Sequence, residues 1–214
     1  MPLAGRPLVE WSIAALRAVP SVRSIVVACP PGHAHELGGD DLGVVDGGAT
    51  RARSVANALA IVDTELVAIH DAARPLLTPE LVEGTIATLA ADPEAGGAIA
   101  ATPVTDTIKR AATPAAKLST FPHQSGDNPP ISVAGTVDRG ELWAAQTPQV
   151  FRVEALRRAL AAAGPAAVEA ATDEAMLVEA AGGRVLIHPA PPENLKVTTP
   201  LDLRVAELLL AARG

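Results

Sequence analysis

The stretch Leu66–Pro75, which reads LVAIHDAARP, decides the fold of this chain. Its first four residues form an apolar run without polar alternation, which is typical of a strand buried on both faces of a parallel sheet. The polar pair His70-Asp71 ends the run, and Pro75 prevents the strand from continuing. Ligands of open α/β sheets bind beyond the carboxyl ends of the strands. The residues that follow this strand are therefore candidates for a binding site.

Asp71 and Arg74 are the two charged residues in that position. A carboxylate offers the hard oxygen ligand that Mg²⁺ prefers, and a guanidinium offers a fork of donors that fits phosphate. The pair therefore indicates a nucleotide or phosphosugar site. The stretch alone leaves an alternative open, in which Asp71 caps the next turn and Arg74 forms a surface ion pair.

Composition excludes several classes of protein. The 214 residues suffice for one substantial α/β domain. A net charge of -7, an aromatic share of 2% and the absence of Tyr argue against nucleic acid or an anionic membrane as a partner. There is no apolar run of about 18 residues and no pattern typical of a signal peptide. The single Cys29 excludes an internal disulfide and fits a cytoplasmic protein.

Strand and helix patterns alternate on either side of the central stretch. Strands are expected at 24–29, 44–45, 97–104 and 184–188, and helices at 8–18, 51–62, 152–163, 172–181 and 200–211, with another helix opening at Thr78. This alternation predicts an α/β fold with a doubly wound, mostly parallel sheet. Residues 111–135 contain four Pro and no helical period, which indicates a loop or protrusion, with 136–139 and 142–146 flanking it as returning strands.

Two further segments carry possible anion contacts. Gly47-Gly48 leads into a helix, where free backbone amides favour anions or carbonyl oxygens and Ser54 adds a hydroxyl. The glycines are equally compatible with a tight turn alone. Lys196 stands between apolar neighbours and offers a compact charge to a phosphate, although a surface lysine is the commoner case. A G-x-G-x-x-G motif is absent, which weakens a dehydrogenase interpretation.

Seven segments taken in order resemble the 2-C-methyl-D-erythritol 4-phosphate cytidylyltransferase family. They are VVDGGATRARSV, VAIHDAARP, TPVTDTIKR, TVDR, LWAAQTPQVF, ATDEAM and NLKVTTPLDL. Ribitol-5-phosphate cytidylyltransferases share much of this set, so the resemblance leaves the polyol open between the two.

The resemblance implies a single Rossmann-like nucleotidyltransferase domain over residues 1–214. A protruding dimerisation arm is expected at 107–139, with a flexible insertion at about 111–135. The implied substrates are CTP and a polyol phosphate, used with Mg²⁺ to give a CDP-linked alcohol and pyrophosphate. The implied assembly is a cytoplasmic homodimer.

The resemblance also implies a set of site residues. Two are expected to be catalytic by holding the attacking phosphate: Arg139 and Lys196. The expected substrate-binding residues are Gly48, Ser54, Asp71, Ala72, Arg74, Thr107 and Thr147.

Within that set the implied roles differ. Gly48 and Ser54 are expected at the cytosine, with Ala49 where the family usually has Asp, and Asp71 at the ribose, the phosphates and the metal. Arg74, Thr147 and Lys196 are expected at the phosphosugar. Thr107 and Arg139 are expected to reach the neighbouring subunit's site from the arm.

The family pattern departs from this chain at the front. The family begins with a strand and a glycine-rich loop followed by Pro-Lys, all before the residue that matches Met1. We expect that strand to lie between the strands at 24–29 and 66–69, and we expect the natural reading frame to start upstream of Met1. The alternative to an enzyme is a catalytically inactive nucleotide-binding protein or dimer scaffold, because the triphosphate cradle has no counterpart here.

Overall fold

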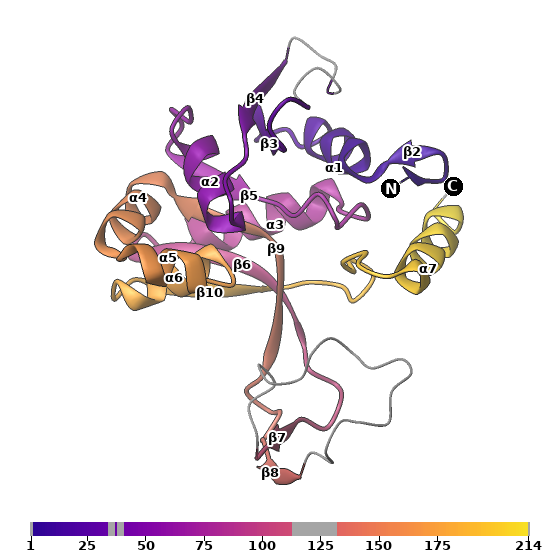
Figure 1. Cartoon of the computed structure of the whole chain (residues 1–214), viewed down its shortest axis with the longest axis vertical. Coiled ribbons are helices and arrows are strands. Elements are labelled where there is room, and N and C mark those ends of the chain that lie inside the picture. Colours follow the sequence, from indigo (N-terminus) through magenta and orange to yellow (C-terminus); the bar gives the residue numbers. More distant parts are fainter. Residues whose placement is uncertain (1, 34–36, 38–40, 113–131, 214) are drawn as a thin grey trace. The chain divides into compact units, whose positions relative to one another are not determined.

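The computed structural model of the chain describes residues 2–33, 37, 41–112 and 132–213 (Figure 1). Two compact units make up the chain, Met1–Thr102 with Ala145–Gly214, and Pro103–Ala144. None of the helices in these described ranges is long and apolar enough to cross a membrane.

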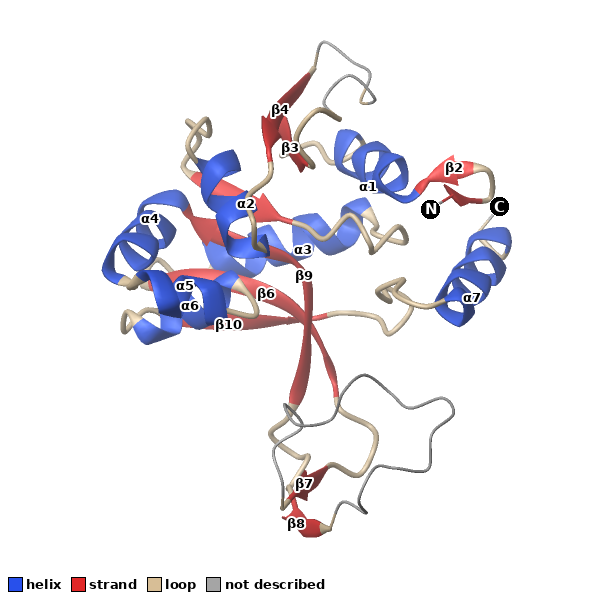
Figure 2. Ribbon diagram, viewed as in Figure 1, coloured by secondary structure: helices blue, strands red, loops and turns tan. Residues whose placement is uncertain are grey.

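The main sheet of the first unit has four strands in the order β10-β6-β9-β5. Figure 2 labels three of them, β10, β6 and β9. Their bounds are Arg184–Pro189 for β10, Ala95–Pro103 for β6, Trp143–Arg152 for β9 and Leu66–Ile69 for β5. β10 runs parallel to β6, whereas β5 runs antiparallel to β9. The sheet is therefore mixed, and its central strand β6 is built from the small and apolar residues that the sequence pattern indicated. The expectation that 66–69 would be buried on both faces of a parallel sheet is wrong, because β5 is a half-buried strand at the sheet edge.

A second sheet in the same unit consists of β3 (Ile25–Cys29) and β4 (Leu42–Asp46), which pair in parallel. In the part of the chain that the structure describes, no hydrogen-bonded ladder joins β3 to β5. Two sheets thus stand where the alternating pattern predicted one. The break lies where the family resemblance places its first strand.

The core lies on both faces of the main sheet. Along β6, Ile99 packs with one helical layer that includes Leu156 and Val178, while Ala100 packs with another that includes Val82. Each of these residues is at most 8% exposed. Successive strand residues point to opposite faces, so helices must cover both sides to bury them. This arrangement confirms the predicted α/β class.

Three helices begin at the residues that the sequence pattern predicted. Thr50 caps α2 (Arg51–Leu59), Thr78 caps α3 (Pro79–Ala90) and Thr199 caps α7 (Pro200–Ala211), each with its hydroxyl accepting a backbone N–H. The remaining helices are α1 (Leu8–Arg17), α4 (Val153–Ala162), α5 (Pro165–Ala170) and α6 (Glu174–Ala180). The sequence patterns did not indicate α5, nor the short hairpin of β1 (Pro2–Leu3) and β2 (Arg6–Pro7) that precedes α1.

The second unit contains a hairpin of β7 (Lys109–Ala111) and β8 (Val133–Thr136). The expected strand at 136–139 is wrong beyond Thr136, because the Asp138 carboxylate accepts the Gly140 N–H at 3.0 Å and forms a turn. The predicted insertion at about 111–135 falls mostly on residues 113–131, which lie outside the described ranges.

The strand expected at 142–146 is longer in the structure, because β9 extends to Arg152. The sequence pattern ended this strand at residue 146 because polar residues, among them Gln146 and Gln149, interrupt its apolar run. Both side chains are buried, at 7% and 1% exposure.

Candidate active site

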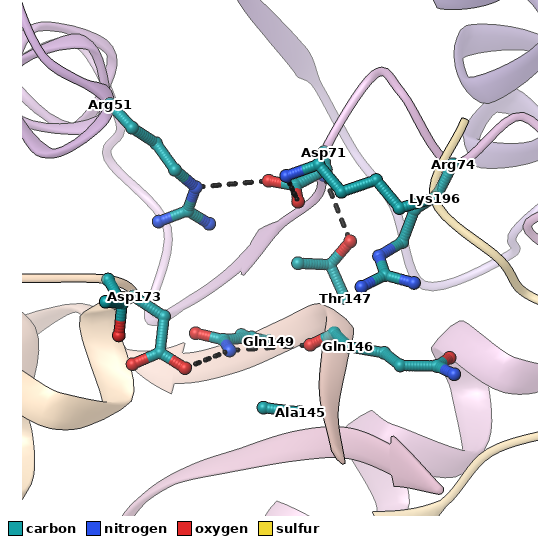
Figure 3. Close-up of a pocket in the computed structure, with 10 residues that line it drawn as sticks. Arg51, Asp71, Arg74, Ala145, Gln146, Thr147, Gln149, Asp173 and Lys196 are labelled. Carbon is teal, nitrogen blue, oxygen red and sulfur yellow. Dashed lines mark hydrogen bonds and ion pairs between the residues drawn. The ribbon is translucent and has the colours of Figure 1, made fainter. Parts of the chain in front are cut away.

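A cleft of about 210 Å³ opens beyond the carboxyl end of β5 (Figure 3). It is lined by Arg51, Asp71, Arg74, Ala145, Gln146, Thr147, Gln149, Thr172, Asp173 and Lys196. Pockets for drug-sized ligands usually measure about 300–1,000 Å³, so this cleft encloses less than the volume of such a ligand site. Its lining is polar and carries three cationic side chains.

Asp71 is at the centre of the lining because the strand register puts it there. β5 pairs Ile69 with Gln149 on β9, and continuing that antiparallel register brings Asp71 opposite Thr147. The Asp71 N–H donates to Thr147 Oγ1 at 3.0 Å. A side-chain hydroxyl thus takes the place of a ladder carbonyl where the strand ends.

Both oxygens of the Asp71 carboxylate are paired with cations. Arg51 Nε donates to Oδ1 at 3.1 Å, and Lys196 Nζ donates to Oδ2 at 3.0 Å. Burial alone would raise the pKa of Asp71, but the bond from Lys196 and the charge of Arg51 outweigh burial and lower it. Asp71 is therefore an anion at neutral pH, and its carboxylate pairs with two cations instead of capping the next turn. Lys196 is exposed, and its ammonium group pairs with Asp71.

Arg51 is held from its other side by Glu174, at the start of α6. Arg51 Nη1 donates to Glu174 Oε2 at 2.5 Å, and Glu174 is 1% exposed. Burial raises the pKa of Glu174, while the attraction of Arg51 offsets part of that effect. Burial would lower the pKa of Arg51, but Glu174 and then Asp71 outweigh it and raise it.

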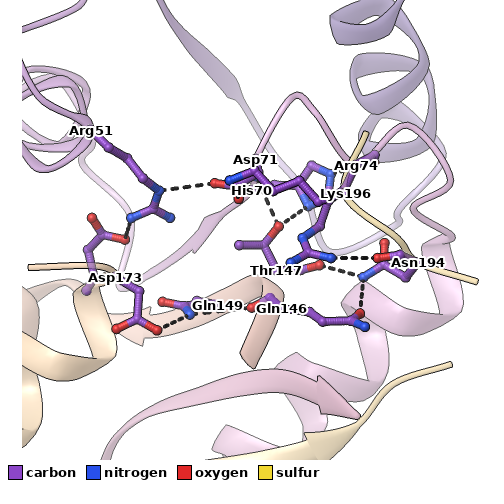
Figure 4. A network of polar contacts seen from close by, with 11 residues as sticks. Arg51, His70, Asp71, Arg74, Gln146, Thr147, Gln149, Asp173, Asn194 and Lys196 are labelled. Atoms are coloured by element: carbon purple, nitrogen blue, oxygen red, sulfur yellow. Dashed lines mark hydrogen bonds and ion pairs between the residues drawn. The ribbon is translucent and has the colours of Figure 1, made fainter. Parts of the chain in front are cut away.

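A closed ring of hydrogen bonds joins three segments around the cleft (Figure 4). His70 contacts Thr147 Oγ1 through Nδ1 and the Arg74 carbonyl through Nε2. Arg74 Nη1 donates to the Asn194 carbonyl at 2.8 Å, and Asn194 Nδ2 donates to the Thr147 carbonyl at 2.8 Å. The ring fixes the segment 70–74 against β9 and against the segment that carries Lys196.

Arg74 is the cation of this ring that keeps unused donor capacity. Its Nε is buried and has no hydrogen-bond partner within the described protein, and burial lowers the pKa of its guanidinium. A buried donor without a partner costs free energy. Because Arg74 lines the cleft, an anionic or carbonyl ligand oxygen is a suitable partner for it.

The glycine segment lies at the start of α2, in the same unit. The Gly48 N–H donates to Ser54 Oγ at 3.0 Å, and Ser54 Oγ donates to the Thr50 carbonyl at 3.0 Å. A Cβ on Gly48 would lie 2.3 Å from Arg53 Cβ, so only glycine fits this turn. The structure thus brings Gly48 and Ser54 together, but neither lines the cleft.

The other predicted residues lie outside the cleft lining. Ala72 is an exposed turn residue directly after Asp71. Thr107 and Arg139 belong to the second unit, where both are exposed and Arg139 Nη1 donates to the Thr105 carbonyl. Of the nine predicted residues, Asp71, Arg74, Thr147 and Lys196 line the cleft.

A metal site can be assessed from the donor set. No group of three or more His, Cys, Asp or Glu side chains suited to a metal occurs among the described residues. Mg²⁺ is usually bound by one or two carboxylates together with substrate phosphates and water. Asp71 fits as a single protein ligand, since each of its oxygens keeps a lone pair beyond its bond to Arg51 or Lys196.

The sequence patterns missed Arg51 and Glu174. A signal for Arg51 was present, because a cation at the first position of a helix opposes the helix dipole and needs a carboxylate partner. Nothing in the local sequence indicated that Glu174 would be buried or that it would be this partner. The sequence patterns also missed Asn194, Gln146 and Gln149. Only their burial in the folded chain identifies them as members of the site.

Known proteins resemble the chain over almost its whole length. Residues 1–212 match the family described as 2-C-methyl-D-erythritol 4-phosphate cytidylyltransferase. A relative of that name from Aromatoleum aromaticum is 42% identical over 226 residues, which span 100% of this chain and 87% of the relative. The bifunctional enzyme IspD/IspF of Anaeromyxobacter dehalogenans is 44% identical over 98% of this chain, which spans only 52% of that longer protein.

Solved structures show the same relationship. The crystal structure of 2-C-methyl-D-erythritol 4-phosphate cytidylyltransferase from Thermus thermophilus superimposes with a TM-score of 0.79 at 33% identity. The comparison covers 98% of this chain and 92% of the other. The likeness therefore extends to the arrangement of the elements that form the cleft.

Proposed function

This chain belongs to the 2-C-methyl-D-erythritol 4-phosphate cytidylyltransferase family, and from that premise we propose that it transfers CMP from CTP to 2-C-methyl-D-erythritol 4-phosphate. Pyrophosphate is the second product, and the reaction serves isoprenoid synthesis. The observation that carries the proposal is the cleft at the end of β5, where Arg51 and Lys196 pair with the Asp71 carboxylate and Arg74 also lines the cleft. Three cations against the carboxylates of Asp71 and Asp173 leave the lining with an excess of one positive charge, which favours anionic substrates.

The bonds that change determine what the cleft must supply. An oxygen of the polyol phosphate attacks the α-phosphorus of CTP, a new P–O bond forms, and the bond to the leaving pyrophosphate breaks. The attacking phosphate is already ionised, so it needs no strong general base. Catalysis then consists mainly of positioning two anions and neutralising the developing negative charge.

Each site residue has a proposed role in that step. Lys196 holds the attacking phosphate, and the Arg74 guanidinium, which lines the cleft, contacts the phosphosugar. Thr147 contacts the phosphosugar, while Gly48 and Ser54 accommodate the cytosine beside the turn that they form. Asp71 and the adjacent Ala72 contact the ribose and phosphates.

Magnesium is proposed as the metal that accompanies CTP, with Asp71 as its one protein ligand. When bound, such an ion neutralises phosphate charge and orients the triphosphate. Arg51 and Lys196 hold the Asp71 carboxylate ionised and oriented for this purpose.

The direct test is release of pyrophosphate from CTP and Mg²⁺ in the presence of 2-C-methyl-D-erythritol 4-phosphate. Parallel reactions replace the polyol with ribitol 5-phosphate, or omit it. Release that depends on methylerythritol phosphate supports the proposal. If pyrophosphate is released only with ribitol 5-phosphate, that polyol phosphate is the substrate. If CTP binds but no pyrophosphate is released, the chain is an inactive nucleotide-binding protein.

A cytoplasmic homodimer with shared sites is proposed as the working assembly. The second unit carries Thr107 and Arg139 on exposed positions, where they are available to a neighbouring subunit. Mixing an Arg139→Ala variant with a Thr147→Val variant should restore part of the activity in mixed dimers. Confirmed mixed dimers without any restored activity would contradict the shared site.

A further inference from the structure

His70 belongs to the hydrogen-bonded ring but, like Asn194, has no role in the proposed reaction. It follows β5 directly, between the strand and Asp71. Its Nε2 lies 3.1 Å from the Arg74 carbonyl oxygen, and its Nδ1 lies 3.0 Å from Thr147 Oγ1 (Figure 4). Both ring nitrogens are therefore engaged, one by the turn 71–74 and one by β9.

These two partners determine where the imidazole proton sits. A carbonyl oxygen only accepts, so Nε2 must carry the hydrogen that bonds to Arg74. Nδ1 of the neutral ring is then an acceptor, and the Thr147 hydroxyl donates its proton to it. In this pairing the neutral ring has a single tautomer, with its hydrogen on Nε2.

The Thr147 hydroxyl has little hydrogen-bonding capacity left. Its only proton goes to His70, and one of its lone pairs accepts the Asp71 N–H at 3.0 Å. A hydroxyl oxygen has two lone pairs, so one remains. Thr147 lines the cleft, where that lone pair can accept a hydrogen bond but the hydroxyl cannot donate one.

We propose that His70 is a positioning residue that orients the Thr147 hydroxyl, so that Thr147 recognises a hydroxyl group of the polyol phosphate and not its phosphate group. An ionised phosphate has acceptors only, whereas a polyol hydroxyl brings the donor that the remaining lone pair requires. The assignment of the ligand group rests on the proposed function, while the orientation of Thr147 does not.

A second histidine–threonine pair supplies a matched control. His188 Nδ1 lies 2.9 Å from Thr88 Oγ1, between β10 and α3. Neither residue lines the cleft. The Thr88 hydroxyl donates its proton to the Gly84 carbonyl, so His188 Nδ1 is the donor in this contact. A His188→Gln variant therefore removes a histidine–threonine contact at a position without a proposed role.

The first experiment reads the histidine tautomers directly from ¹⁵N chemical shifts of the free protein near pH 7. The His70 signal is identified by its loss in a His70→Gln variant, with His188→Gln as the control. We expect a single Nε2–H tautomer for His70. A predominant Nδ1–H form, a doubly protonated ring or an even mixture would overturn the positioning role, whatever the enzyme's activity.

The second experiment separates the two nitrogens of His70 by kinetics. An Asn side chain places an acceptor near the position of Nδ1, whereas a Gln side chain reaches toward that of Nε2. We expect His70→Gln to raise KM for the polyol phosphate roughly threefold to tenfold, as for one lost neutral hydrogen bond, and His70→Asn to raise it less. KM for CTP should stay unchanged in both. Equal losses in the two folded variants, or a larger effect on CTP, would overturn the proposal.

The third experiment identifies the ligand group with monodeoxy analogues of 2-C-methyl-D-erythritol 4-phosphate. In the unchanged protein, loss of the matching hydroxyl should weaken binding or raise KM roughly threefold to tenfold. In Thr147→Val, binding of the same analogue should be no weaker than binding of the full substrate, because the partner of the hydroxyl is already missing. Thr147→Ser should again bind the full substrate more tightly than the analogue. Penalties that are equal in the unchanged protein and in Thr147→Val for every analogue would overturn the hydroxyl assignment.

Failure of the proposed function gives a different result. If the unchanged protein neither turns over nor binds any polyol phosphate by calorimetry, the proposed function and the ligand assignment both fall. The ¹⁵N measurement still decides whether His70 orients Thr147.

Discussion

The cleft cluster around Asp71 and the glycine turn before α2 are built in opposite ways. In the cluster, Asp71 bonds to Lys196, 125 residues away, and Arg51 bonds to Glu174, 123 residues away. In the turn, Gly48 bonds to Ser54, six residues away. Long-range side-chain bonds hold the first region, and local backbone geometry holds the second.

This difference predicts how each region responds to a substitution. A side chain of the cluster can be shortened while the strands beneath it stay in place, so its loss should affect function first. The turn leaves no room for a Cβ on Gly48, so its loss should affect folding first. Three predictions test this contrast, from the largest expected effect to the smallest.

Lys196→Ala should give the largest effect, and it should fall on turnover. Losing a charged contact in such a site costs about 2–5 kcal/mol, and the lower part of that range applies because the Lys196 side chain is 44% exposed. The measurements are kcat/KM from pyrophosphate release and the Kd of CTP from calorimetry, which should change little. Arg17→Ala, which breaks an exposed ion pair with Asp41, is the control and should leave both unchanged. Unchanged kinetics in Lys196→Ala would make Lys196 an ordinary surface residue.

Gly48→Ala should lower the free energy of unfolding. A Cβ 2.3 Å from Arg53 Cβ forces the turn or the start of α2 to shift, and such overpacking costs about 1–3 kcal/mol. The urea midpoint should fall, and CTP affinity should fall with it if the turn holds the cytosine. Gly164→Ala is the matched control, because nothing lies within 4 Å of its Cβ position. Equal stability of the two variants would show that the turn tolerates a side chain.

Glu174→Gln should give the smallest change in the free energy of unfolding, and that change should depend on pH. The pKa of Glu174 is raised in the folded state, so its contribution to stability is full below its ordinary value of 4.5 and is lost as pH rises through the folded-state pKa. Gln does not ionise, so the stability of the variant relative to the original should improve between about pH 4 and about pH 7, by no more than on the order of 1 kcal/mol. Urea unfolding across this range measures the trend.

The functional effect of the same variant should have the opposite sign. With Gln at position 174, Arg51 keeps a neutral partner but loses a charged one, so Asp71 is held less firmly. We expect kcat/KM to fall by no more than about tenfold at pH 7 while stability is kept. Glu179→Gln, an exposed change on the same helix, is the control. For the stability measurement, a variant that loses stability relative to the original protein as pH rises would contradict the prediction. It would mean that Arg51 stabilises the ionised form of Glu174 more than burial destabilises it.

Local sequence was sufficient for most of the elements. Thr78 and Thr199 marked the starts of two helices, because a hydroxyl that accepts a backbone N–H acts within four residues of the chain. It was insufficient for β9, whose direction depends on pairing with β5, and for the break between β3 and β5. Strand pairing joins residues that are distant in sequence, so no local pattern contains it.

The sequence by itself determined the α/β class, the position of the cleft at the end of β5, the family, and four residues that line the cleft: Asp71, Arg74, Thr147 and Lys196. The tertiary structure decided that Arg51 and Lys196 share the Asp71 carboxylate, that Glu174 anchors Arg51, and that His70 lies within hydrogen-bonding distance of the Thr147 hydroxyl. The reason is physical, because helix starts and strand ends are encoded by neighbours, whereas the partner of a charge or a hydroxyl is whichever distant side chain the packed sheet brings within about 3 Å.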